Sequence, residues 1–352
     1  MRFLLALLLS GVVLSASADH AVILMYHHVD ENTPASTSVR PEQFRRQLDY
    51  IQENGFVVMP LKELLDAIYG GGEVPENAVA ITFDDAYESV HRVALPELVS
   101  RAMPFTVFVA TKAVERGYDG SMSWQDLAEL ADSGLATFGA HSISHEHLLR
   151  GSETGVTDDW TKRVSAEIDH SAAVLKQKFA ELFVPAFAYP FGEYSPALQA
   201  LVEARNYYGL AQQSGALGAS TATTEIPRFP MAQSYDSLER LAMALNTRPL
   251  PVADVQAGQM FIADISAAPQ ELRFTLTADG PYRREQLACY SSTGEALALT
   301  REAAQFTVAL PPFRAGRNKV NCTAPSTERG AEFFWYARQW VLADDEGRWL
   351  KY

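Results

Sequence analysis

Short apolar runs alternate with helix-period segments between residue 20 and about residue 246, and this alternation constrains the fold more than any other feature. The predicted strands are Ala21–Met25, Gly55–Val58, Val79–Phe83, Phe105–Ala110, Leu135–Gly139 and Ala186–Tyr189. The predicted helices include Pro41–Asn54, Ser123–Asp132, Asp158–Phe179 and Ser195–Ala204. Repeated strand–helix units predict a parallel sheet covered by helices. About seven such units in this length of chain indicate an α/β fold, a (β/α) barrel that is distorted or incomplete.

The pattern changes after Asn246, where Thr-Arg-Pro-Leu-Pro predicts a linker over residues 247–256. Helical periodicity is weak beyond it, and Gly and Pro separate the apolar runs. These runs are Leu272–Leu276, Gln286–Tyr290, Phe306–Leu310, Lys319–Cys322 and Phe333–Leu342. We therefore expect a barrel domain over residues 19–246 and a small all-β, sandwich-like domain over residues 257–352.

The first 18 residues match the pattern of a secretory signal peptide. Arg2 precedes the apolar run Phe3–Leu14, and Ala16-Ser17-Ala18 supplies small residues for cleavage. The run is too short to span a bilayer as a helix, although a membrane anchor is the alternative. No later segment is apolar enough to span. We expect an exported protein without a transmembrane segment in its mature chain, either periplasmic or secreted.

Charge and cysteine content narrow the partners and the compartment. The chain has 29 Lys and Arg against 43 Asp and Glu, a net charge of −14. This argues against nucleic acid or an anionic membrane as partner, because both are bound through basic patches. The two cysteines, Cys289 and Cys322, are expected to form a disulfide in an oxidising compartment. The alternative is two buried free thiols.

Chemically reactive side chains follow two of the predicted strands. Asp84 and Asp85 end the run Val79–Phe83, and His141 and His145 follow Leu135–Gly139. The carboxyl ends of barrel strands carry the active site. One carboxylate and two imidazoles would hold a divalent cation with an open position, and the histidine spacing predicts one face of a helical turn. The second carboxylate would be a base, which predicts a metal-assisted hydrolase. A solvated turn or a helix N-cap is the alternative for the two aspartates.

Two further segments could complete such a site. Tyr26-His27-His28 follows the first strand, and a histidine there could protonate a leaving group. The alternative is a histidine that caps a strand end. The segment Tyr189–Tyr194 contains Pro and Gly, which predict a tight loop that could direct a backbone N–H at an oxyanion. An ordinary turn fits this segment equally well.

Together these four segments resemble the NodB-homology polysaccharide deacetylases, carbohydrate esterase family 4, over about residues 20–230. The resemblance implies that Asp84 is the catalytic base. It implies that Asp85, His141 and His145 bind a divalent metal, for which zinc is the first choice and cobalt or nickel the alternatives.

The resemblance also assigns the loop after the last predicted strand. Pro190, Phe191 and Gly192 match the family's Pro-Tyr/Phe-Gly loop, which implies that the Phe191 backbone N–H stabilises the oxyanion. Substrate-binding candidates are Pro190, Tyr189, Tyr194 and Trp124. The aromatic residues among them could stack on a sugar, as could Phe191, and each could equally belong to the core.

The sequence departs from the usual family pattern in two places. The family's arginine before the Pro-Tyr-Gly segment is missing from Val184–Phe187, and Arg228 could replace it in orienting the base. The family's late catalytic histidine is also missing, since Leu238–Leu245 contains none. A circularly permuted subgroup places this histidine in an N-terminal Met-Tyr-His segment, which Met25–His27 matches, so His27 is assigned as the acid.

This subgroup resembles exported deacetylases of biofilm poly-N-acetylglucosamine. We therefore expect a metal-dependent enzyme that hydrolyses N-acetyl groups of an acetylated polysaccharide to acetate and free amine. The alternatives are an O-acetyl esterase on xylan-like polymers, an N-deacetylase of peptidoglycan or chitin, and a catalytically silent carbohydrate-binding protein. The C-terminal domain could bind polysaccharide or a protein partner.

Overall fold

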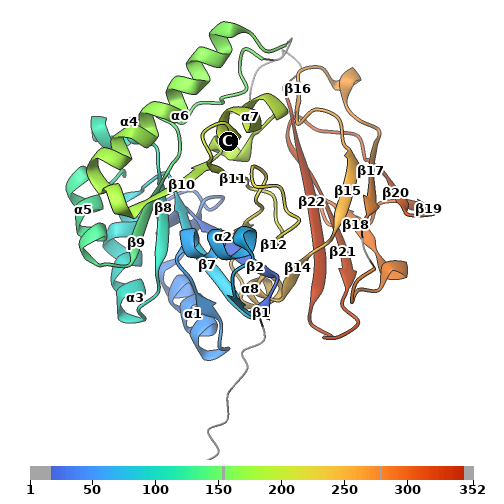
Figure 1. Cartoon of the computed structure of the whole chain (residues 1–352), viewed down its shortest axis with the longest axis horizontal. Helices are drawn as coiled ribbons and strands as arrows, with labels where there is room; N and C mark the ends of the chain where they lie inside the picture. Colours follow the sequence, from blue (N-terminus) through green and yellow to red (C-terminus); the bar gives the residue numbers. More distant parts are fainter. Residues whose placement is uncertain (1–16, 153–154, 278, 345–352) are drawn as a thin grey trace, which may run out of the picture.

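The computed structural model describes residues 17–152, 155–277 and 279–344. Two parts lie side by side in Figure 1: a curled, helix-covered sheet in blue to yellow-green, and a β-rich part in orange and red. The expected signal peptide lies outside the described residues apart from Ser17–Ala18, which form the short strand β1 paired with β6 (Val74–Pro75). Within the described residues, no helix has the length and apolar character to cross a membrane.

The first part is built on a curled sheet in which the order is β11-β10-β9-β8-β7-β2-β12. Its strands are β2 (His20–Tyr26), β7 (Ala78–Asp84), β8 (Phe105–Val109), β9 (Ala136–Ala140), β10 (Phe183–Ala188), β11 (Tyr208–Leu210) and β12 (Leu217–Gly218). Pairs from β11 to β2 are parallel, whereas β12 is antiparallel to β2. The short β5 (Val57–Val58) also pairs with β7. The predicted distorted (β/α) barrel is confirmed.

The central strands are buried on both faces, which explains why they read as continuous apolar runs. Every residue of β7 is buried, and alternate side chains enter two different clusters. Val79 and Ile81 pack in the cluster that contains Phe44 and Leu48 of α1 (Pro41–Glu53). On the opposite face Ala78 and Ala80 pack with α2 (Leu61–Gly70). The period-2 alternation of a strand thus joins helices to both faces.

The remaining helices lie between strands, as the alternation predicted. They are α3 (Leu95–Ser100), α4 (Thr111–Arg116), α5 (Trp124–Asp132), α6 (Asp158–Phe179), α7 (Pro196–Glu203) and α8 (Leu238–Leu245). A π-helical turn, Val90–Ala94, precedes α3, and 3₁₀ turns cover Ala180–Leu182 and Pro190–Gly192. The four predicted helices agree with the observed bounds to within one residue at each end.

One irregular segment bridges the two ends of the parallel run. Ile226 forms an isolated parallel bridge with Leu210 of β11. Three residues later, β13 (Phe229–Pro230) pairs in parallel with β2. The segment therefore closes the gap between β11 and β2, and it places Arg228 between its two contacts.

The second part consists of two sheets around their own apolar core. One sheet has the order β14-β22-β21-β18 with β16 beside β22, and the other has the order β15-β17-β20-β19. The strands are β14 (Thr247–Pro249), β15 (Val252–Gln256), β16 (Phe261–Ile262), β17 (Glu271–Leu276), β18 (Ala288–Ser291), β19 (Leu299–Glu302), β20 (Gln305–Ala309), β21 (Gly316–Pro325) and β22 (Phe333–Leu342). Short 3₁₀ turns cover Ile265–Ala267 and Arg284–Gln286. The predicted all-β region is confirmed, whereas its boundaries stay a prediction.

Two expectations about this part are tested directly. Cys289 and Cys322 form a disulfide between the neighbouring strands β18 and β21, as predicted. The expected linker over residues 247–256 is wrong, because β14 and β15 occupy it. β14 pairs in parallel with β22, and Leu250 packs in the core of the β region, so this segment is built into the sheets.

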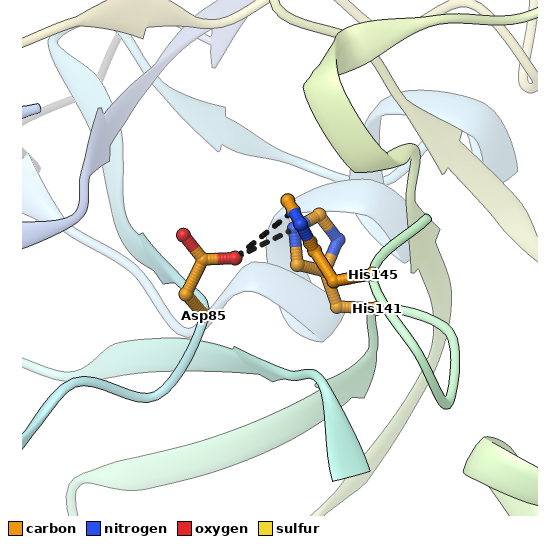
Figure 2. A group of neighbouring side chains, drawn as sticks. All are labelled: Asp85, His141 and His145. Carbon is orange, nitrogen blue, oxygen red and sulfur yellow. Dashed lines mark ion pairs between the residues drawn. The ribbon is translucent and has the colours of Figure 1, made fainter. Parts of the chain in front are cut away.

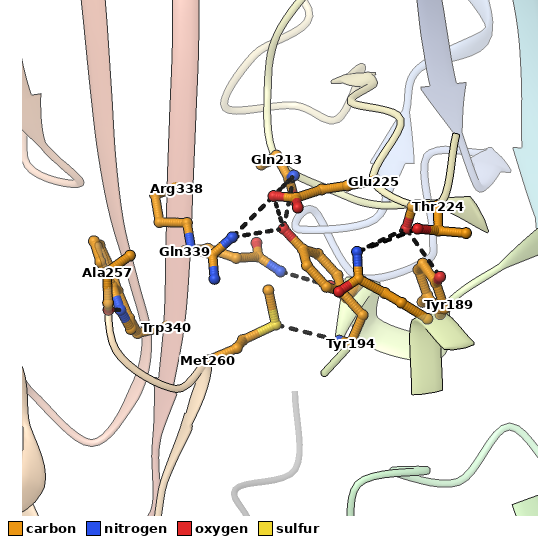
Figure 3. Close-up of polar contacts among 12 residues, drawn as sticks. Tyr189, Tyr194, Gln213, Thr224, Glu225, Ala257, Met260, Arg338, Gln339 and Trp340 are labelled. Carbon is orange, nitrogen blue, oxygen red and sulfur yellow. Dashed lines mark hydrogen bonds and ion pairs between the residues drawn. The ribbon is translucent and has the colours of Figure 1, made fainter. Parts of the chain in front are cut away.

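The β region packs directly against loops of the barrel (Figure 3). Arg338 of β22 donates to the carboxylate of Glu225 at 2.9 Å, and the same carboxylate accepts the Tyr194 hydroxyl. The buried Gln339 amide donates to the Gly192 carbonyl at 2.7 Å. This contact ties the β region to the loop that follows β10, one of the loops predicted to carry chemistry.

Candidate metal centre and active site

A sharp turn at the end of β7 separates the two aspartates. Asp84 is the last residue of the strand, and Asp85 and Ala86 follow with φ of 75° and 60°. Two successive residues in the left-handed region reverse the direction of the chain. The Asp84 carboxylate therefore reaches Arg228, while Asp85 reaches the two histidines.

The histidines lie on a loop after β9, not on the helical turn that their spacing predicted. Residues 141–147 have no helical hydrogen-bond pattern, and Ser142 and His145 have φ of 64° and 53°. Glu167 of α6 explains the difference, because its carboxylate accepts the backbone N–H groups of Ile143 and Ser144 at 2.8 and 2.9 Å. The loop is thus stabilised by a side chain from a distant helix, which the local spacing could not reveal.

Asp85, His141 and His145 converge at one point (Figure 2). The Asp85 Oδ1 atom lies 3.3 Å from His141 Nε2 and 3.1 Å from His145 Nε2. The one potential ligand atom from each residue lies within 4.8 Å of the other two. Burial acts to raise the pKa of Asp85, but the two imidazoles outweigh it and hold that pKa well below its usual range. Asp85 is therefore an anion that faces two nitrogen donors.

Two buried atoms of this cluster indicate that it fits a cation. Within the described chain, Asp85 Oδ1 and His141 Nε2 have no hydrogen-bond partner. Buried polar atoms without a partner are unfavourable. The His141 Nδ1 atom lies 2.7 Å from the Ala188 carbonyl, so Nδ1 carries the proton and Nε2 presents a lone pair to the cluster. A cation bound between Asp85 and His141 would satisfy both atoms.

Asp84 forms a fully buried pair with Arg228. The two guanidinium nitrogens each donate to one carboxylate oxygen at 2.7 Å, and Arg228 Nε donates to the Ala211 carbonyl at 3.0 Å. Burial acts to raise the pKa of Asp84, but Arg228 outweighs it, so that pKa lies below its usual value. The bridging segment between β11 and β2 thus brings an arginine to the position that the sequence left without one.

A cavity of about 400 Å³ opens beside the cluster, and His27, Asp85, His145 and Phe191 line it. Burial lowers the pKa of the His27 side chain. His28, the neighbour that could have taken the same role, instead stacks on Tyr87 with ring centroids 3.5 Å apart. The structure therefore places His27, and not His28, in the wall of the cavity beside the Asp85 cluster.

The loop after β10 presents Phe191 to this cavity. Phe191 and Gly192 have φ of 58° and 68°, and a Cβ on Gly192 would lie 2.5 Å from the Gln212 Cβ, so glycine is required there. The Phe191 ring stacks on His147 with centroids 4.1 Å apart. His147 is buried and its Nδ1 lies 2.9 Å from Glu193, so it supports the loop from behind.

The other predicted substrate contacts do not line this cavity. Tyr189 is buried, and its hydroxyl donates to the Thr224 carbonyl at 2.9 Å. Tyr194 is buried against the Glu225 carboxylate, and the Trp124 ring packs against Phe179 of α6 with centroids 6.4 Å apart. Neither these three residues nor the buried Pro190 lines the cavity. Tyr189 and Tyr194 are therefore buried in the core, the alternative that the sequence left open, whereas Trp124 is partly buried against it.

The cavity also contains residues that the sequence reasoning missed. Burial, together with the nearby Asp85 carboxylate, raises the pKa of Tyr87, and the side chain of Tyr87 lines the cavity. Its position two residues after Asp85 could have identified Tyr87 as a candidate site residue from the sequence. Ser292, Arg317 and Lys319 come from the β region, more than 200 residues along the chain from the Asp84–Asp85 pair. No local motif marks these three residues.

Sequence comparison places the site in a known context. Residues 71–210 match the polysaccharide deacetylase family. The poly-beta-1,6-N-acetyl-D-glucosamine N-deacetylase of Escherichia coli K12 is 24% identical over 263 residues, which cover 64% of this chain and 38% of that protein. The enzyme of the same name from Staphylococcus epidermidis is 24% identical over 241 residues, 63% of this chain and 82% of that one. This chain thus spans little more than a third of the E. coli relative.

Solved structures agree on the fold. IcaB from Ammonifex degensii superposes with a TM-score of 0.55 at 25% identity, over 62% of this chain and 95% of IcaB. The Streptococcus pyogenes deacetylase PplD, solved in complex with acetate, has a TM-score of 0.57 at 23% identity and covers 65% of this chain. Each match leaves about a third of this chain without a counterpart.

Proposed function

We propose that this chain, whose residues 71–210 match the polysaccharide deacetylase family, is an exported, metal-dependent N-deacetylase of a polymer containing N-acetylglucosamine. The names of the E. coli and S. epidermidis relatives support a substrate of the poly-N-acetylglucosamine type. The N-terminal apolar run supports export to the periplasm or the medium.

One observation carries the proposal: Asp84, ionised and paired with Arg228, ends strand β7, and the next residue, Asp85, belongs to the cluster beside a cavity that can admit a substrate. Asp85, His141 and His145 would hold the metal. The mixed oxygen and nitrogen donors suit zinc, cobalt or nickel. A bound divalent cation would polarise the acetyl carbonyl and lower the pKa of the attacking water.

The chain's own side chains supply the proton transfers. Asp84 accepts a proton from the attacking water, and the two hydrogen bonds from Arg228 leave each carboxylate oxygen with a second acceptor position. As the water oxygen bonds to the acetyl carbon, the Phe191 backbone N–H donates to the developing oxyanion. The C–N bond then breaks, and His27 in its imidazolium form transfers its proton to the amine nitrogen. Asp84 then releases its proton to solvent and His27 takes one up, which restores both side chains. The products are acetate and a free amino sugar.

The test is acetate release by the purified mature protein from N-acetylglucosamine oligomers. The assay is run after chelation, and again after zinc, cobalt or nickel is added back. Release that requires the metal supports the proposal. Release only from O-acetylated xylan oligomers would replace it with an esterase, and oligomer binding without release under any metal would replace it with a carbohydrate-binding protein.

A further inference from the structure

The cavity beside the cluster continues into a second cavity of about 360 Å³ at the seam between the barrel and the β region. Both cavities are lined by Pro230, Tyr235, Ser292 and Lys319. We call the combined space the seam groove. It leads from His27 and His145 to strands β18 and β21, so a chain that enters the candidate site can extend along the β region.

One wall of the seam groove is a row of side chains on the outer face of β21. Arg317, Lys319, Asn321 and Thr323 alternate with Val320, Cys322 and Ala324, which are buried in the core of the β region. Because successive side chains of a strand point to opposite faces, the four polar residues share one face and span about 20 Å. They line the cavities in their sequence order, Arg317 at the cluster and Thr323 at the far end.

Two exposed tyrosines line the seam groove beside this wall. Tyr235 is 43% exposed and comes from the barrel side, and Tyr290 of β18 is 37% exposed and lies opposite Asn321 in the sheet. Both line the second cavity. Large aromatic rings left in solvent inside a groove indicate a binding surface, because a ring offers an apolar face together with a polar hydroxyl. Sugars present the matching combination of C–H faces and hydroxyl groups.

The charges that line the seam groove select the kind of glycan. Arg240 and Arg317 are cationic, Lys319 is cationic at a pH below its pKa, and Asp85 at the cluster is the sole carboxylate among the described residues that line the two cavities. Burial, with a smaller effect from Arg317, lowers the pKa of Lys319 to about 7. A positive wall repels ammonium groups, although the chain as a whole has a net charge of −14.

We propose that the seam groove binds the acetylated, uncharged stretch of polymer next to the sugar at the cluster, with Tyr235 and Tyr290 as stacking surfaces and the β21 row as the polar wall. The proposal rests on the proposed function for the identity of the polymer. It gives the β region a role in substrate selection, since sugars that have already lost their acetyl groups carry a positive charge and are disfavoured there.

The first test compares oligomers of two and six N-acetylglucosamine units by calorimetric binding to the Asp84→Asn protein. Tyr290→Ala should weaken binding of the hexamer about fivefold and change binding of the dimer less than twofold. Tyr290→Phe keeps the ring and should retain hexamer affinity. Ile265→Ala removes an exposed apolar side chain of the β region outside both cavities and is the matched control. Equal losses for dimer and hexamer, or no loss, would overturn the proposal.

The second test addresses charge, with the fully acetylated hexamer and its fully deacetylated counterpart at pH 6. The acetylated hexamer should bind at least fivefold more tightly, and Lys319→Met should narrow the difference. Tighter binding of the deacetylated hexamer would contradict the proposal. Neither test requires turnover. If the protein binds hexamers through Tyr290 but releases no acetate, the seam groove proposal stands and the proposed reaction is wrong. If it releases acetate but Tyr290→Ala leaves hexamer binding unchanged, the reaction stands and the seam groove proposal is wrong.

Discussion

The barrel and the β region contribute to the candidate site in different ways. The barrel supplies the Asp85 cluster and the Asp84–Arg228 pair from strand ends and a bridging segment. The β region supplies no member of the cluster, but it contributes Arg317 and Lys319 to the cavity wall and contacts the loop at Phe191. The reactive groups therefore belong to the barrel, whereas part of their surroundings belongs to the β region.

The reactivity of the site and its contacts with the polymer are therefore determined by two different regions of the chain. Barrel topology brings strand ends together regardless of which domain follows, and this fixes the positions of ionisable groups. The β region contacts the cavity through long side chains, and Arg317 and Gln339 also donate to backbone carbonyls of the loop at Phe191–Gly192. Substitutions in the β region should therefore alter which polymer reacts and how firmly this loop is held. Substitutions in the two regions should accordingly produce different patterns of loss.

The largest effect is expected in the barrel, at the proposed base. Asp84→Asn removes the proton acceptor and should lower kcat by 10²-fold or more, while metal content measured by elemental analysis stays the same. His141→Gln should instead abolish stoichiometric metal binding. His170→Gln alters an exposed histidine of α6 and serves as the control for both. Full activity of Asp84→Asn, or full metal content of His141→Gln, would remove that residue from its assigned role.

The next effect concerns the buried pair. Arg228→Met leaves the Asp84 carboxylate buried without its partner, which should lower the free energy of unfolding by about 3–5 kcal/mol at pH 7. In the wild type the pKa of Asp84 is lowered, so its contribution to stability is present at neutral pH and disappears as the pH falls through that pKa.

Without Arg228 the effect of burial remains and raises the pKa of Asp84, so the sign reverses. The variant should be least stable at neutral pH and should recover as the pH falls and the carboxyl group protonates. Urea unfolding at pH 7 and pH 5 measures this. The double variant Asp84→Asn with Arg228→Met should be more stable at pH 7 than Arg228→Met alone. Additive losses would show that the two side chains are not coupled.

A smaller effect is expected where the β region clamps the oxyanion loop. Gln339 donates to the Gly192 carbonyl at 2.7 Å and Arg317 to the Phe191 carbonyl at 2.8 Å, on a loop whose backbone has positive φ at both residues. Gln339→Leu should lower kcat about tenfold with little change in KM or metal content, because the loop loses its fixed position.

Arg273→Met provides the control for the clamp, since it removes an exposed β17 side chain that pairs locally with Glu271. The conservative Gln339→Glu change keeps the size of the side chain but replaces the N–H donor with an acceptor, and it should resemble Gln339→Leu. If Gln339→Leu raised KM and left kcat intact, the clamp would act on substrate binding and not on placement of the loop.

The sequence was informative where a property is local or topological. Buried parallel strands appear as continuous apolar runs, so the barrel and the neighbourhood of Asp85, His141 and His145 were predictable. The conformation of the histidine loop was not, because Glu167 of a distant helix determines it. For aromatic residues of the motif, such as Tyr189, the sequence left core and site open, since a ring next to a functional loop can equally face the core, and Tyr189 is buried.

Removal of the disulfide is expected to have the smallest effect on the reaction but a clear effect on stability. It closes a separation of 33 residues between β18 and β21, for which chain entropy predicts a stabilisation of about 2–4 kcal/mol. The double variant Cys289→Ser with Cys322→Ser should lower the unfolding temperature while metal content at 25 °C stays unchanged. Because β21 carries the polar wall, hexamer affinity should fall before activity on the dimer as the temperature rises. A simultaneous loss of both would show that the barrel and the β region unfold as one unit.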